Sequence, residues 1–185
     1  MININDIKNG MTITYEGNVY QIVEFQHVKP GKGSAFVRTK LKNLRTSTTQ
    51  EITFNAGIKV QKANVSKETL SYIYSTGNTY VFMDNNTYEQ TEINEDMLKD
   101  NIKFLKEGLS VELLIYNDEI IGISLPEKVT YEVIKADEAV KGNTTSSAQK
   151  DVTIETGYVL KAPLFINEGE NIIVTTKDGK YSSRA

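Results

Sequence analysis

Short runs of alternating apolar and polar residues dominate the chain, and turn-forming residues separate them. A period of two is typical of β-strands with one buried face. The predicted strands cover residues 11–15, 19–28, 35–45, 50–54, 57–62, 69–75, 79–84, 87–92, 110–116, 119–125, 129–135, 151–155, 158–162 and 171–176. Strands this short, spaced roughly 8–12 residues apart, favour small β-barrels over a parallel α/β sheet. We therefore predict an all-β fold.

One segment has the period of a helix instead. Its apolar residues recur at spacings of four, three and four: Leu98, Ile102, Leu105 and Leu109. Asn94 is a suitable N-cap, and Gly108 lies where a helix would end. We therefore predict one helix between Asn94 and Leu109.

Breaks in these patterns suggest three domains. The best boundaries lie near residues 63–66 and at 126–128, where Pro126 ends one run before another begins at Val129. The predicted domains are residues 1–63, 64–127 and 128–185. Segments of about 60 residues are long enough for small barrels but only marginally stable alone.

Composition excludes several classes of function. The chain has 185 residues, no cysteine and one histidine, His27. Disulfides, thiolate metal sites, cysteine nucleophiles and multi-histidine metal sites are therefore excluded. No apolar run is long enough to span a membrane, and the first six residues lack the features of a signal peptide. We expect a soluble cytoplasmic protein.

The net charge of −3 conceals an uneven distribution. The predicted first domain carries +5, the second −8, and the third zero. A basic first domain beside an acidic second one suggests that the first meets a polyanion. The alternative is ordinary surface variation among small domains, and composition alone does not decide between them.

The most distinctive motif is the segment Lys29-Pro30-Gly31-Lys32-Gly33-Ser34, which joins two long predicted strands. Proline fixes φ, and the glycines allow turn conformations that side chains disfavour. Lys32 therefore has no bulky neighbour at the end of a β-ribbon and can extend away from the protein. Alternatively, it is an ordinary exposed turn lysine.

The strand after this turn carries a basic stripe. Its alternate positions are Phe36, Arg38, Lys40, Lys42 and Leu44. With Lys29, Lys32 and Arg45, this stripe predicts a positive ribbon suited to a phosphate backbone. His27, just before the tip, has no nucleophile or paired carboxylate evident beside it, so packing or RNA stacking is expected of it.

The tip and its flanks resemble bacterial translation elongation factor P. The similarity is carried by Phe25-Gln-His-Val-Lys-Pro-Gly-Lys-Gly-Ser-Ala-Phe-Val-Arg38 and extends through the chain. Tyr80-Val-Phe-Met-Asp84 with Tyr88-Glu-Gln90 is similar to the family's middle domain. Gly157-Tyr-Val-Leu-Lys-Ala-Pro163 is similar to its C-terminal signature. The tip together with these ordered segments is specific, whereas Gly-Lys-Gly alone is weak.

The resemblance implies an L-shaped, tRNA-like arrangement of three barrels, an SH3-like (KOW-type) domain followed by two OB-folds. It implies a monomeric, non-enzymatic factor that binds the ribosome between the peptidyl-tRNA and exit-tRNA sites. There it would relieve stalling at consecutive prolines. Lys32 matches the tip residue placed near the tRNA acceptor end, often modified by a dedicated enzyme; an aminopentanol extension is expected with this tip pattern. No other cofactor is implied.

The resemblance also implies RNA contacts in the third domain. Gly142, Asn143 and Thr144 match a loop directed at exit-site mRNA, with Asn143 where aspartate is commoner. Tyr181 and Arg184 match positions near the small subunit and tRNA.

Two other functions remain open from the residues alone. A general OB-fold binder of single-stranded nucleic acid would need aromatic platforms and a basic groove through all domains, which the acidic middle domain disfavours. A lysine-dependent enzyme using Lys32 as a Schiff base would need a desolvated pocket, and a glycine-flanked tip is the opposite environment.

Overall fold

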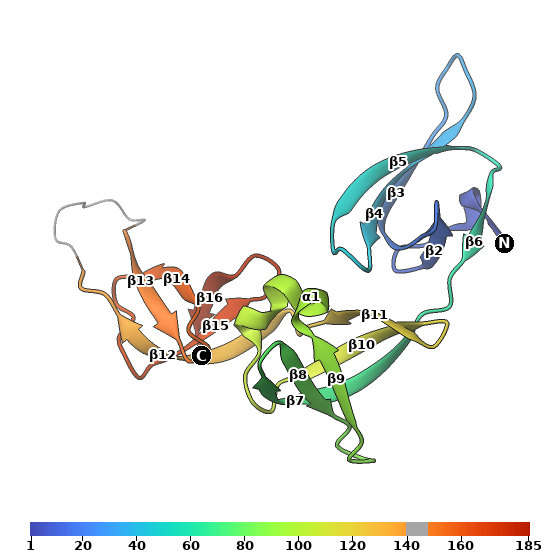
Figure 1. Cartoon of the computed structure of the whole chain (residues 1–185). Coiled ribbons are helices and arrows are strands. Elements are labelled where there is room, and N and C mark those ends of the chain that lie inside the picture. Colours follow the sequence, from blue (N-terminus) through green and yellow to red (C-terminus); the bar gives the residue numbers. More distant parts are fainter. Residues whose placement is uncertain (140–147) are drawn as a thin grey trace. The chain divides into compact units, whose positions relative to one another are not determined.

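The computed structural model describes residues 1–139 and 148–185. The chain forms three β-sheets, one after another along the sequence (Figure 1). The first sheet has the order β1-β6-β2-β3-β4-β5, the second β11-β10-β7-β8-β9, and the third β14-β13-β12-β15-β16. The predicted all-β fold is confirmed.

The strands of the first sheet are β1 (Ile2–Asn3), β2 (Thr12–Tyr15), β3 (Asn18–Val28), β4 (Phe36–Asn43), β5 (Thr49–Asn55) and β6 (Lys59–Lys62). Those of the second are β7 (Ser66–Thr76), β8 (Thr79–Met83), β9 (Gln90–Asn94), β10 (Ser110–Tyr116) and β11 (Glu119–Ser124). Those of the third are β12 (Lys128–Ala136), β13 (Gln149–Ile154), β14 (Val159–Pro163), β15 (Asn171–Thr175) and β16 (Lys180–Arg184). A 3₁₀ turn, η1 (Ile4–Asp6), follows β1.

Two tight hairpins show how the sequence fixes strand register. Glu16 and Gly17, with φ of 47° and 77°, join β2 to β3, and Asn117 and Asp118, with φ of 51° and 60°, join β10 to β11. Positive φ at both loop residues is the conformation whose twist matches that of paired strands.

The predicted helix is mostly wrong. Only α1 (Glu95–Leu98) is α-helical, and Lys99, with φ of 46°, leads into a 3₁₀ helix, η2 (Lys99–Phe104). The Asn94 cap is confirmed, because its side chain accepts a hydrogen bond from the Asp96 amide. Successive three-residue turns bury leucines much as a helix would, and the Phe104 carbonyl accepts a 2.5 Å hydrogen bond from the buried Tyr131 hydroxyl. Tertiary packing therefore overrides the local period.

Strand β16 was not predicted. Its sequence, Lys-Tyr-Ser-Ser-Arg, has too few apolar residues to show alternation, and its pairing with β15 defines it. The predicted strand 87–92 is also shifted, because Asp84 and its neighbours form a turn before β9 begins at Gln90.

The described residues form two compact units. The first contains Met1–Glu68 and Leu113–Gly122, and the second contains Thr69–Glu112 and Ile123–Ala185. The main core of the first unit comprises Ile4, Ile7, Ile13, Tyr20, Ile22, Val37, Leu41, Phe54 and Val60. A smaller cluster in the same unit joins Val19, Leu44 and Ala63 to Leu114 and Ile121. No helix among residues 1–139 and 148–185 is long and apolar enough to cross a membrane.

Candidate functional site: the β3–β4 hairpin

Strands β3 and β4 form the longest ribbon of the first unit, and the loop between them extends beyond the sheet (Figure 1). Their pairing runs from Tyr20 opposite Asn43 to Val28 opposite Phe36, with a bulge between Ile22 and Glu24. Strand β5 pairs along the other edge of β4. The base of the tip is therefore held by three strands.

Every residue of the tip from Lys29 to Ser34 is exposed. Gly33 has φ of 109°, a conformation that side chains rarely adopt, whereas Gly31 has no such constraint and no atom within 4 Å of an added Cβ. Beyond the last strand pair, the Ala35 carbonyl accepts a 3.0 Å hydrogen bond from the Ala56 amide. The backbone thus anchors the loop at its base and presents Lys32 to solvent.

His27 packs beside the base of the tip. Its ring meets the ring of Phe25 edge to face, with centroids 5.4 Å apart, and Phe25 packs in turn on the main core of the first unit. The imidazole is otherwise exposed, so its contact with RNA stays a prediction.

Strand β4 separates a buried face from a solvent face. Val37, Thr39, Leu41 and Asn43 are buried, whereas Arg38, Lys40 and Lys42 are exposed. Leu44, predicted on the same strand face as the basic stripe, does not lie there. The strand ends at Asn43, and Leu44 turns into the smaller core cluster.

Cross-strand pairing changes the meaning of the basic stripe. Lys40 lies opposite Glu24 on β3 and opposite Glu51 on β5, and all three are exposed. Directly opposed residues share a face with Cβ atoms about 4.5–5.5 Å apart. Arg38, by contrast, lies opposite Gln26 and Thr53. Lys42, farther from the tip, also lies opposite two neutral residues, Gln21 and Thr49. Of the three cations on this face of β4, Lys40 is therefore the one whose charge is compensated across the strands.

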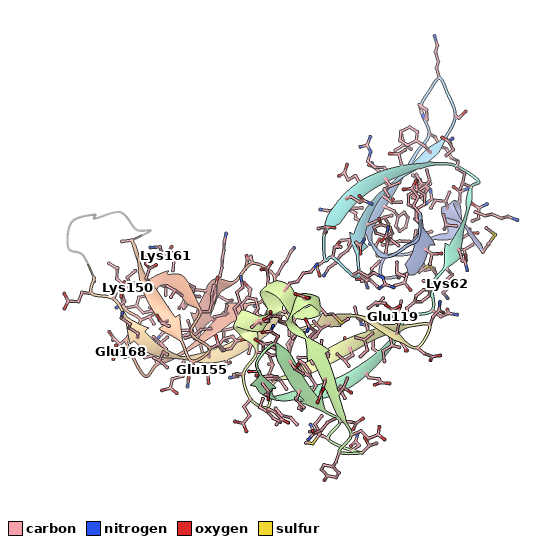
Figure 2. The ribbon with its side chains drawn as sticks, in the orientation of Figure 1. Lys62, Glu119, Lys150, Glu155, Lys161 and Glu168 are labelled. Atoms are coloured by element: carbon pink, nitrogen blue, oxygen red, sulfur yellow. The ribbon has the colours of Figure 1, made fainter. Side chains whose placement is uncertain are left out.

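Arg45 lies at the other end of the ribbon from the tip. Its guanidinium binds the carboxylate of Glu119 through two hydrogen bonds, of 3.1 and 3.3 Å. Glu119 is labelled in Figure 2. The guanidinium lowers the pKa of Glu119. This pair ties the turn after β4 to the β10–β11 hairpin, so the structure does not bring Arg45 together with Lys32.

The RNA-binding residues predicted in the third domain are only partly described. Tyr181 and Arg184 both lie on β16, where Arg184 forms an ion pair with Glu170. Gly142, Asn143 and Thr144 lie outside the described residues. None of these residues belongs to the β3–β4 hairpin.

Sequence patterns did not predict two features of these sites. The pairing of Lys40 with two glutamates depends on register, which the turn length alone does not fix when a bulge intervenes. Phe165 stands in the apolar run Leu164-Phe165-Ile166, typical of a core segment, yet its side chain is exposed.

Among the residues described, no group of three or more histidine and acidic side chains could hold a metal ion.

The chain matches three family models in order. They are the elongation factor P KOW-like domain over residues 3–60, the elongation factor P OB domain over 65–123, and the elongation factor P C-terminal domain over 129–184.

Relatives match over the full length. The chain is 55% identical to an elongation factor P of Aster yellows witches'-broom phytoplasma (strain AYWB) and 54% identical to one of Phytoplasma australiense. Each alignment spans 185 residues, 100% of this chain and 98% of the relative. Among solved structures, a eukaryotic translation initiation factor 5A from Methanococcus jannaschii matches 66% of this chain and 92% of its own. Its TM-score is 0.50 at 23% identity, so it supports the fold alone.

Proposed function

The chain belongs to the elongation factor P family of translation elongation factors, and on that premise we propose that it binds the ribosome between the peptidyl-tRNA and exit-tRNA sites and promotes peptide-bond formation at consecutive prolines. Lys32 is the effector group, delivered near the acceptor end of the peptidyl-tRNA. The factor acts in the cytoplasm as a monomer.

The observation that carries this proposal is the construction of the tip. A loop anchored by three strands presents Lys32 to solvent, and Gly33 holds a backbone conformation that favours glycine. Lys29 is exposed beside Lys32, and Arg38, the β4 cation nearest the tip, lies opposite the neutral residues Gln26 and Thr53. Such a tip suits insertion between phosphate-rich surfaces, because Lys and Arg displace condensed counterions there.

The proposed contribution of the factor is positional. Proline is a constrained, poor attacking amine, and a long group held beside the tRNA terminus favours the reactive geometry. Well-oriented reactants can save up to about 7–11 kcal/mol of activation free energy. Ribosomal RNA remains the catalyst, so no residue of this chain is assigned a catalytic role.

We further propose that a modifying enzyme extends Lys32, as its exposed and unhindered position permits. Intact-mass spectrometry of protein from its native source tests this, with an added mass localised to the tip peptide as the expected result. An unmodified tip peptide in actively growing cells would contradict it. Contact of residues 142–144 with exit-site mRNA is likewise proposed.

Lys32→Ala tests the function, with Lys62→Ala as the matched control. Both lysines are exposed in the first unit, and both variants lose one positive charge. We expect Lys32→Ala to slow synthesis through a Pro-Pro reporter by about tenfold, or ~1.4 kcal/mol of activation free energy, and Lys62→Ala to match the wild type. Equal rates for all three proteins would overturn the proposal.

A further inference from the structure

Phe165 occupies an unusual position in the loop between β14 and β15. Its neighbour Ile166 is completely buried, yet the side chain of Phe165 is 56% exposed. Exposing a large aromatic ring costs the hydrophobic stabilisation that burial would give. The loop thus anchors itself through Ile166 while leaving the adjacent ring in solvent.

A cation covers part of this ring. The guanidinium carbon of Arg184, on β16, lies 5.5 Å from the centroid of the Phe165 ring. Cations within about 6 Å of a ring face are attracted by its quadrupole. Two segments separated by β15 therefore combine a flat ring and a flat guanidinium in one small area of the second unit.

Charged neighbours hold the guanidinium in place. Arg184 forms an ion pair with Glu170, whose other carboxylate oxygen accepts a 2.7 Å hydrogen bond from the Asn167 amide. These bonds and the nearby charge of Lys150 lower the pKa of Glu170. Lys150 belongs to the third sheet (Figure 2) and is 9% exposed. Glu170 therefore stays ionised at neutral pH and orients Arg184, whose side chain remains 57% exposed.

We infer that Phe165 and Arg184 form a stacking platform for an unpaired RNA base. Unpaired bases stack on aromatic rings and on guanidinium planes. The residues that follow the platform, Asn167, Glu168 and Gly169, are exposed and polar or small, and Pro163 and Leu164 before it are only partly exposed. This inference rests on the proposed function, which places the chain on an RNA-rich partner.

Local charge favours a base over a phosphate. Arg184 and Lys150 are balanced by Glu168 and Glu170, so the platform carries no excess positive charge. Phosphate contacts depend steeply on salt because they release counterions. Stacking neutralises no phosphate, so it releases none. The platform should therefore add affinity that salt hardly changes.

The first experiment measures ribosome affinity of the full-length protein. We expect Phe165→Ala to weaken binding between about 5-fold and 150-fold, the range for loss of one stacked base. Phe165→Tyr should bind like the wild type. Phe165→Leu, which keeps apolar bulk but no aromatic face, should lose as much as the alanine variant. Because the side chain is exposed, thermal unfolding should change little and serves as the folding control.

Two further readouts separate stacking from other roles. Phe165→Ala should leave unchanged the slope of log affinity against log salt concentration. p-Azidophenylalanine at position 165 should crosslink to a ribosomal RNA or tRNA nucleotide, whereas the same group at the exposed Tyr88 should not. Unchanged affinity of Phe165→Ala, full binding by Phe165→Leu, or crosslinks to protein alone would overturn the inference.

Different results would contradict the proposed function and the stacking platform. If the wild-type protein did not bind ribosomes, the proposed function itself would fail. If it bound and supported Pro-Pro synthesis while Phe165→Ala bound equally well, only the platform would be wrong. Excess factor should restore Pro-Pro synthesis by Phe165→Ala but not by Lys32→Ala.

Discussion

Gly31 and Gly33 flank the same lysine but have different structural roles. Only Gly33 has a φ, 109°, that a side chain disfavours, and an added Cβ would lie 3.8 Å from the Pro30 ring. Gly31 has ordinary φ and open space around it. The sequence predicted that both glycines permit the turn, but which of them requires glycine depends on the backbone angles that the folded loop adopts.

Gly33→Ala should therefore distort the tip, whereas Gly31→Ala should not. Residues in sparsely populated backbone regions cost of order 1–3 kcal/mol, and an exposed loop relieves this strain by changing shape. We expect Gly33→Ala to reduce synthesis through Pro-Pro while the thermal midpoint stays within a few degrees. Equal reporter activity of the two variants would contradict this role for Gly33.

The Arg45–Glu119 pair makes stability depend on pH. Arg45 lowers the pKa of Glu119 below its ordinary 4.5 in the folded protein. The stabilisation is therefore present above the unfolded pKa and is lost as pH falls through the folded one. Urea unfolding should show the wild type more stable than Glu119→Gln at pH 7. The two curves should converge in acid, and a constant difference at every pH would argue against the pair.

At the level of elements, the strands follow from alternation but their partners do not. The period of two predicted β3 and β4 nearly to the residue, and it correctly placed Arg38, Lys40 and Lys42 on one face. It could not show that Glu24 and Glu51 flank Lys40, because that depends on pairing with two other strands and on a bulge. The helix failed for a related reason: three-residue turns and a helix bury similarly spaced leucines.

This pairing predicts unequal roles for two cations on one strand. Arg38→Gln should reduce the salt dependence of ribosome binding, lowering the slope of log affinity against log salt by about one. Lys40→Gln removes the same charge from between two glutamates and should change the slope much less. Affinities measured from about 50 to 200 mM salt compare them. Equal slopes would contradict the compensation of Lys40 by its two glutamate neighbours.

On the scale of the whole molecule, the two compact units are not continuous stretches of the sequence. Residues 113–122 join the first unit although they lie about fifty residues beyond β6. The reason is the apolar cluster of Val19, Leu44 and Ala63 with Leu114 and Ile121. The predicted boundary near residues 63–66 marks a change of pattern, but it does not indicate which later segment completes the apolar surface.

Gly122 permits this long-range contact. A Cβ built on Gly122 would lie 2.6 Å from the Leu44 carbonyl oxygen, closer than real Cβ contacts come. Gly122→Ala should therefore force the segments apart and lower the free energy of unfolding by about 1–3 kcal/mol, the usual cost of overpacking. Gly31→Ala is the control, since its Cβ meets nothing. Equal urea midpoints for the two variants would show that the contact adapts freely.

The sequence by itself determined the all-β class, the strands of the hairpin, the glycine-flanked Lys32 and the family resemblance, because each depends on local period or on residues in a fixed order. Tertiary structure decided that Lys40 lies between glutamates, that Arg45 binds Glu119, and that Phe165 is exposed under Arg184. Each of these depends on which distant segments meet. Which segments meet depends on strand pairing and packing energies summed over the whole fold, and no local sequence pattern encodes that sum.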